Sequence, residues 1–108
     1  MKTYLDPKTG ILTVTLKGDL VSTAADQVRG QMTALLETPT SPDATWKLFR
    51  LDLVTAKMVD SVGLNFIITI LKAVQKNGAK MQILYTNQNV HRTFLFTRLD
   101  QHIELVKI

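Results

Sequence analysis

The apolar positions at the start of the chain predict a β-hairpin. Leu12, Val14 and Leu16 alternate with polar residues, which is the period-two pattern of a strand with one buried face. A shorter strand is expected at Tyr4-Leu5, because the turn sequence Asp6-Pro7-Lys8-Thr9-Gly10 separates the two segments. Proline fixes one turn position and glycine permits a positive φ, so this sequence suits a tight reversal of the chain.

The apolar positions then change to helical spacing. They recur every third or fourth residue and predict a first helix over residues 23–37. Thr23 and Asp26 stand three positions apart near its start and resemble a shortened capping box. Residues 38–43 contain two prolines, which a helix cannot accommodate, and are expected to form a surface loop.

A buried strand and a long amphipathic helix are predicted in the middle of the chain. Residues 46–53 are almost continuously apolar, as in the interior strands of a sheet. A broad apolar face predicts a helix over residues 61–77, which Asn77-Gly78 would stop. A strand, a third helix and a last strand are then predicted at residues 81–85, after Asn87 and at residues 103–106.

The predicted order of elements is therefore ββαβαβαβ. Three crossovers from strand through helix to strand imply a mostly parallel, mixed β-sheet with right-handed connections, to which the first strand adds an edge. With 108 residues and 45% hydrophobic content, the chain fits a single α/β domain over residues 1–108.

Composition narrows the functional classes. The chain has no cysteine, which excludes disulfides and thiolate chemistry. It shows neither a signal-peptide pattern nor an apolar run of about 18 residues, so we expect a soluble, cytoplasmic protein that does not bind a membrane. The net charge of +4 is compatible with an acidic partner or with nucleic acid. Nucleic-acid binding is the weaker of the two interpretations, because the cations are scattered and no aromatic residues are interleaved with them.

An enzymatic site is not predicted. Ser61 with His91 or His102 could nominally supply a nucleophile and a base, but these residue types are common. The Gly-x-Ser-x-Gly elbow is absent, and the five glycines are too far apart to cradle a phosphate. The two histidines are eleven positions apart with no cysteine nearby, so no metal site and no cofactor are expected.

The motif Asp60-Ser61-Val62-Gly63-Leu64 at the start of the long helix is the main functional candidate. A serine at this place can either cap the helix or accept a phosphate beside unpaired N–H groups and the positive end of the helix dipole. Considered by itself, the motif favours capping, because serine is a common N-cap. The preceding Met58 and Val59 are either tucked under the fold or presented to a partner, and the sequence leaves both open.

The whole arrangement resembles the STAS domain, a family named for sulfate transporters and anti-sigma factor antagonists. The resemblance rests on Gly18-Asp19-Leu20-Val21 after the second strand and on residues 60–64 at the start of the second helix, and it spans nearly the full length. The family usually has aspartate at the position of Val21, and often a second small residue at that of Val62. Within the family, the chain is most similar to free-standing bacterial anti-sigma factor antagonists.

This resemblance implies a role in transcription regulation by partner switching. The unphosphorylated protein would bind an anti-sigma factor serine kinase and so free a sigma factor. Phosphorylation of Ser61 would block that binding, and a serine phosphatase would reset the switch. The alternative is a constitutive STAS interaction or scaffold module, in a signalling or transport-associated complex, in which Ser61 is only a helix cap. The expected partner-binding residues are Asp19, Val21, Ser22, Thr23, Lys57, Met58, Val59, Asp60, Val62, Gly63 and Leu64.

Overall fold

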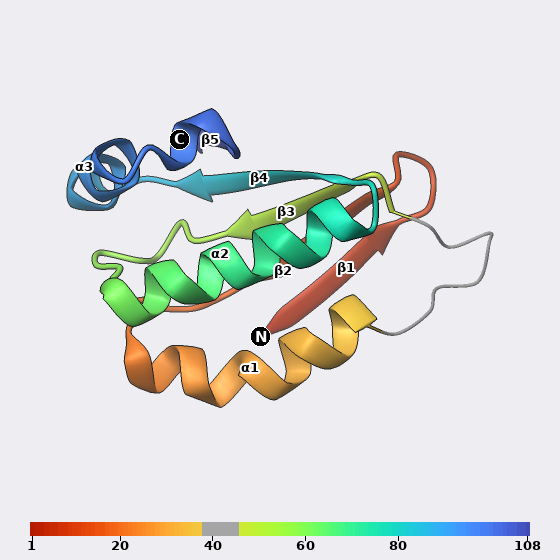
Figure 1. Ribbon diagram of the computed structural model, residues 1–108, viewed down its shortest axis with the longest axis horizontal. Helices are drawn as coiled ribbons and strands as arrows, with labels where there is room; N and C mark the ends of the chain where they lie inside the picture. Colours follow the sequence, from red (N-terminus) through yellow and green to blue (C-terminus); the bar gives the residue numbers. More distant parts are fainter. Residues whose placement is uncertain (38–45) are drawn as a thin grey trace.

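The computed structural model of the chain describes residues 1–37 and 46–108. Within these residues the element order is the predicted ββαβαβαβ (Figure 1), with an additional short 3-10 helix that the sequence did not predict. The predicted loop at residues 38–43 lies outside the described residues. The elements are β1 (Lys2–Asp6), β2 (Ile11–Thr15), α1 (Ser22–Glu37), β3 (Leu48–Asp52), α2 (Ser61–Lys76), β4 (Lys80–Tyr85), α3 (Gln88–Phe96), η2 (Leu99–Gln101) and β5 (Glu104–Lys107).

The strands form one mixed sheet. Their spatial order follows the chain, β1-β2-β3-β4-β5, with β1 antiparallel to β2 and every later pair parallel. The nearly continuous apolar character of β3 predicted an interior strand, and β3 is the central strand. The prediction that the first strand adds an edge is also confirmed.

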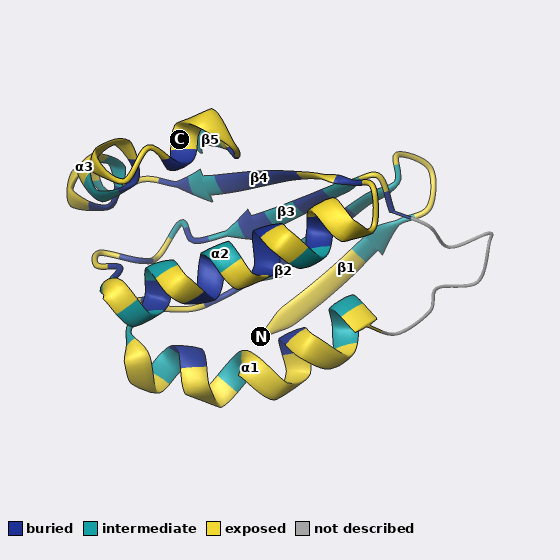
Figure 2. Ribbon diagram, in the orientation of Figure 1, coloured by how far each residue is buried: buried dark blue, intermediate teal, exposed yellow. Residues whose placement is uncertain are grey.

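Side-chain alternation along the strands separates a core face from a more polar face. On β3, Phe49 and Leu51 are fully buried under the helices, whereas Arg50 between them is half-buried on the opposite face. There the Arg50 Nε–H donates to Oε1 of Gln82 on the neighbouring strand, at 2.6 Å. The buried side chains therefore lie between the sheet and its helices, as the dark blue segments of Figure 2 show.

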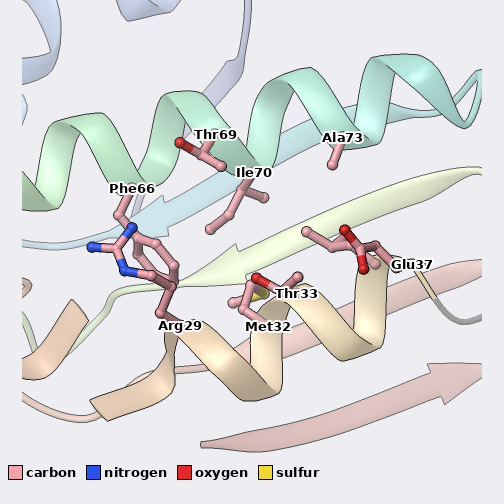
Figure 3. A pocket seen from close by; sticks show the side chains of 9 residues that line it. Arg29, Met32, Thr33, Glu37, Phe66, Thr69, Ile70 and Ala73 are labelled. Atoms are coloured by element: carbon pink, nitrogen blue, oxygen red, sulfur yellow. The ribbon is translucent and has the colours of Figure 1, made fainter. Parts of the chain in front are cut away.

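Helices α1 and α2 lie side by side over the sheet (Figure 1). The apolar face predicted for α2 consists of Leu64, Ile67, Ile68, Leu71 and Val74. Phe66 and Ile70 lie outside this set, yet both are buried, because α1 packs against that side of the helix. A shallow groove runs between the two helices, with Ile70 and Met32 lining its floor (Figure 3). The Arg29 guanidinium lies 5.5 Å from the centre of the Phe66 ring.

The predicted ends of the later helices are confirmed. Asn77 ends α2, and its backbone N–H donates to the carbonyls of Ala73 and Val74, while Gly78 follows with a φ of +74°. Asn87 caps α3, because its side-chain oxygen accepts from two backbone N–H groups of the first turn. None of the described helices is long and apolar enough to cross a membrane.

Candidate functional site

The candidate site lies where two loops leave the carboxyl ends of β2 and β3. The loops run beside each other, and Leu20 forms an isolated parallel bridge with Val59. The Leu20 N–H donates to the Met58 carbonyl at 3.0 Å, and the Asp60 N–H donates to the Leu20 carbonyl at 3.2 Å. The two motifs that the sequence separates by about forty positions are therefore one hydrogen-bonded unit.

Side chains join the same two loops further along. Oδ1 of Asp19 accepts from the Lys57 N–H at 2.8 Å, and Oγ1 of Thr55 accepts from the Gly18 N–H at 2.8 Å. Thr55 was not among the candidates from sequence, because a single threonine in a loop carries no distinguishing pattern. Asp19 is predicted to contact a partner, and in the structure its carboxylate holds the neighbouring loop.

Asp60 binds the first turns of two helices at once. Its Oδ1 accepts from the Gly63 N–H at 2.8 Å, which makes Asp60 the N-cap of α2. Its Oδ2 accepts from the Ser22 N–H of α1 at 3.1 Å. The first N–H groups of a helix have no partner within the helix, so one carboxylate satisfies an unpaired donor on each of α1 and α2. Figure 1 shows these two helix starts lying close together.

This geometry corrects two expectations about helix starts. Ser61 is not the N-cap of α2, because Asp60 holds that position and Ser61 is the first helical residue. Thr23 does not begin a capping box with Asp26, because α1 already begins at Ser22 and Asp26 instead pairs with Arg29 at 3.3 Å. For α1, the long-range contact from Ser22 to Asp60 takes the place of the predicted local cap, whereas for α2 the cap is local and moves from Ser61 to the adjacent Asp60.

Ser61 is exposed at the tip of this arrangement. Within the described part of the chain, its hydroxyl makes no hydrogen bond, and its backbone lies in the first turn of a sixteen-residue helix. An anion attached to the hydroxyl would sit beside unpaired N–H groups and the positive end of the helix dipole. Asp60 therefore provides the cap of α2, so capping does not account for a serine at position 61.

Gly63 sets how closely the start of α2 approaches the first loop. A Cβ at this position would lie 2.1 Å from the Leu20 carbonyl oxygen and 3.0 Å from the Leu20 carbonyl carbon. Those atoms are backbone, so they cannot move aside as the end of a flexible side chain could. Gly63 therefore packs directly against the backbone of the motif after β2.

Met58 and Val59, the two apolar residues before Asp60, differ in burial. Val59 is buried beside Leu20, whereas the Met58 side chain is 55% exposed. Val59 therefore fits the interpretation that these residues are packed under the fold, and Met58 fits the interpretation that they are presented to a partner. We call the exposed parts of residues 18–23 and 57–64 the helix-start surface. It contains every residue expected to bind a partner, although Val59 and Gly63 contribute mainly to packing.

The segment before α3 is hydrogen-bonded to the loop after β3, and α3 itself bears two exposed apolar residues. Thr86, just before α3, donates from its Oγ1 to the Val54 carbonyl in the loop after β3, at 2.8 Å. At the other end of α3, Phe96 is 91% exposed and Leu95 is 46% exposed. Val90, Phe94 and Leu95 are the apolar residues that predict this helix in the sequence, and of these Val90 and Phe94 are buried whereas Leu95 is not.

The histidines do not form a reactive group with Ser61. Nδ1 of His91 is 2.5 Å from the Tyr85 hydroxyl, and the two rings are stacked with centroids 5.5 Å apart. His91 is thus half-buried against the core, whereas His102 is exposed. Across residues 1–37 and 46–108, no group of three or more histidine, aspartate and glutamate side chains is placed to hold a metal ion.

Comparison with known families agrees with this architecture. The STAS domain model matches residues 5–108, so the chain belongs to the STAS domain family. Among proteins of curated function, none matches the sequence.

Solved structures share the fold at low sequence identity. A putative anti-sigma factor antagonist from Thermotoga maritima superimposes with a TM-score of 0.81 at 18% identity, over 99% of this chain and 86% of that one. A sulfate transporter family protein from Wolinella succinogenes gives 0.72 at 13% identity, over 92% and 79%. The anti-sigma factor antagonist SpoIIAA in its unphosphorylated form gives 0.69 at 12% identity, over 99% and 87%.

Proposed function

We propose that this STAS domain is an anti-sigma factor antagonist whose binding to an anti-sigma factor kinase is switched by phosphorylation of Ser61. One observation carries the proposal. The Ser61 hydroxyl is exposed and unbonded within the described chain, at a helix start where Asp60 already provides the cap. The similarity in fold to two anti-sigma factor antagonists supports the same role.

A phosphate on Ser61 would affect the fold and the interface differently. It would add about 1.5 to 2 negative charges. Within the fold, the start of α2 favours each added negative charge by about 0.3–1 kcal/mol. The nearest carboxylate, Asp60, is already held by two backbone N–H groups. Little unfolding is therefore expected.

At an interface the same charge would be costly. The surface around Ser61 presents the apolar Met58 and the half-buried Val62. A partner packed on these side chains would exclude water from the phosphate, or meet it with like charge, at a cost of several kcal/mol. A loss of about 3 kcal/mol is more than a hundredfold in affinity. The unmodified protein would bind the kinase and free a sigma factor, and a serine phosphatase would restore the binding form.

The first experiment identifies the modified atom. The protein is used to capture its partners from the source cell, and the captured material is incubated with ATP. Thr69→Ala is a matched control, because Thr69 carries an exposed hydroxyl on the same helix but lies outside the helix-start surface. We expect phosphate on the wild type and on Thr69→Ala, and none on Ser61→Ala. Equal labelling of Ser61→Ala would contradict the assignment of the site.

The second experiment separates charge from size. Ser61→Asn and Ser61→Asp introduce side chains of nearly equal volume, and only the aspartate is charged. We expect Ser61→Asp to bind the captured kinase at least tenfold more weakly than Ser61→Asn, with both variants folded by circular dichroism. Equal binding by the two variants would instead support a constitutive interaction or scaffold module.

A further inference from the structure

The outer edge of β1 has no partner strand among residues 1–37 and 46–108. β1 is the first strand of the sheet, and within these residues it pairs with β2 alone. Its first three residues are exposed, and Tyr4 exposes 65% of its side chain, as the yellow part of β1 in Figure 2 shows. An edge strand presents backbone N–H and C=O groups that another strand can pair with.

The sequence of β1 is complementary to itself in charge. When two copies pair antiparallel with full overlap, the strand Lys2–Asp6 must be centred on Tyr4. Lys2 of each copy then lies opposite Asp6 of the other, and Tyr4 lies opposite Tyr4. The register with β2 shows that Lys2, Tyr4 and Asp6 share the face opposite the buried side chains, since Leu5 pairs with buried Leu12. Both oppositely charged pairs therefore form on one face of the extended sheet.

From this complementarity we propose that two copies of the chain associate through β1, joining their sheets across a two-fold axis at Tyr4. Opposite charges directly across an antiparallel pair are favourable, and like charges are unfavourable. Edge strands often carry charges that block such pairing, but here the two charges differ in sign and so favour it. Within the described residues only Oδ1 of Asp6 accepts a hydrogen bond from a side chain or turn N–H, that of Lys8 at 2.9 Å, which leaves its Oδ2 for Lys2 of the other copy.

The other edge of the sheet does not offer the same pairing. Side chains directly opposite each other in a sheet point to the same face. A two-fold axis between two antiparallel copies of one strand must therefore lie between a residue and the same residue of the other copy. The four residues of β5 have no central residue. In addition, Lys107 on β5 already donates to the side chain of Gln88.

This dimer would leave the helix-start surface accessible on both copies. Ser61 lies beyond the carboxyl end of β3, whereas the interface runs along the side of β1. The two-fold axis reverses the strand direction of the second sheet, so the two Ser61 residues would face opposite ends of the assembly. The association is therefore independent of the proposed phosphorylation.

Sedimentation of the full chain over a concentration series tests the proposal. We expect the wild type to shift from 12.1 kDa towards twice that mass as concentration rises. Lys2→Glu would place Glu opposite Asp6 in both pairs and weaken association about tenfold. Lys8→Glu is the matched control, because it makes the same charge change in the same hairpin outside the strand, and it should associate like the wild type.

Exchanging the two charges of β1 gives the most direct test of the pairing. The double variant Lys2→Glu with Asp6→Lys restores opposite charges across the interface and should regain the association that Lys2→Glu loses. Amide hydrogen exchange gives a second measurement, since β1 amides should become protected as concentration rises. A wild type that stays monomeric to its solubility limit would overturn the proposal, as would equal effects of Lys2→Glu and Lys8→Glu. Loss of the dimer in Ser61→Asp would also overturn it, by placing the interface at the helix-start surface.

Discussion

The close approach of α2 to the loop after β2 makes Gly63→Ala a quantitative test of the site's architecture. The added Cβ would lie 2.1 Å from the Leu20 carbonyl oxygen. Carbon and carbonyl oxygen approach to about 3.3 Å, so the helix start or the loop must move by about 1 Å. That movement would strain or break the bond from the Asp60 N–H to the same oxygen, which is 3.2 Å long.

The expected cost follows from three contributions. Overpacking of this kind costs about 1–3 kcal/mol. A lost hydrogen bond costs about 0.5–1.5 kcal/mol. Alanine is preferred over glycine inside a helix by about 0.5–1 kcal/mol, which offsets part of the loss. We therefore expect Gly63→Ala to lower the free energy of unfolding by about 2 kcal/mol, a large part of the roughly 5–15 kcal/mol of a typical domain.

Gly30 provides the matched control for this measurement. It lies within α1, and a Cβ there would have no heavy atom within 4 Å. Gly30→Ala should therefore raise the free energy of unfolding by about 0.5–1 kcal/mol, through helix propensity alone. Urea denaturation of both variants followed by circular dichroism measures the difference. If Gly63→Ala were stabilised as much as Gly30→Ala, the argument that Leu20 and α2 require glycine for close packing would be wrong.

Two further predictions concern single groups. Asp60→Ala removes the acceptor of an N–H group in the first turn of both α1 and α2, and should lower the free energy of unfolding, measured by urea denaturation, by about 1–3 kcal/mol. The control Asp26→Ala loses only an exposed ion pair and should leave the free energy of unfolding almost unchanged. Equal effects of the two would refute the double-cap role. Burial raises the pKa of Tyr85 above its usual 10.0. The phenol therefore ionises at lower pH in the unfolded chain than in the folded protein. The contribution of protonated Tyr85 to the free energy of unfolding is complete below pH 10 and is lost as the pH rises through the folded pKa. Denaturation midpoints across this range should fall more steeply in the wild type than in Tyr85→Phe, and parallel curves would contradict the assignment.

Local patterns were sufficient to predict most of the fold. The alternation at Leu12 and Val14 and the helical spacing after Ser61 each reflect one buried face, which is a property of neighbouring residues. Asn87 and Asn77-Gly78 marked helix ends for the same local reason, because caps are made within one turn. The order of these elements then restricted the topology, since crossovers between parallel strands are right-handed.

The site depended on contacts between distant segments. The cap of α2 is the exception, because Asp60 and Gly63 are only three positions apart, and the sequence interpretation gave the capping role to the adjacent Ser61. The same carboxylate reaches Ser22 only because β2 and β3 are neighbours whose loops emerge together. Likewise, Met58 and Val59 look alike in sequence, and only the bridge to Leu20 buries one and exposes the other.

The sequence by itself therefore determined which segments are strands and helices and that Gly63 stands near the start of one helix. The tertiary structure alone decided what that glycine touches and that the Asp60 carboxylate also reaches the start of α1. It also decided which hydroxyl remains exposed and unbonded in the described chain. The reason is physical: periodicity records whether a residue faces the core, whereas hydrogen bonds and close contacts across loops depend on the relative placement of segments far apart in the chain.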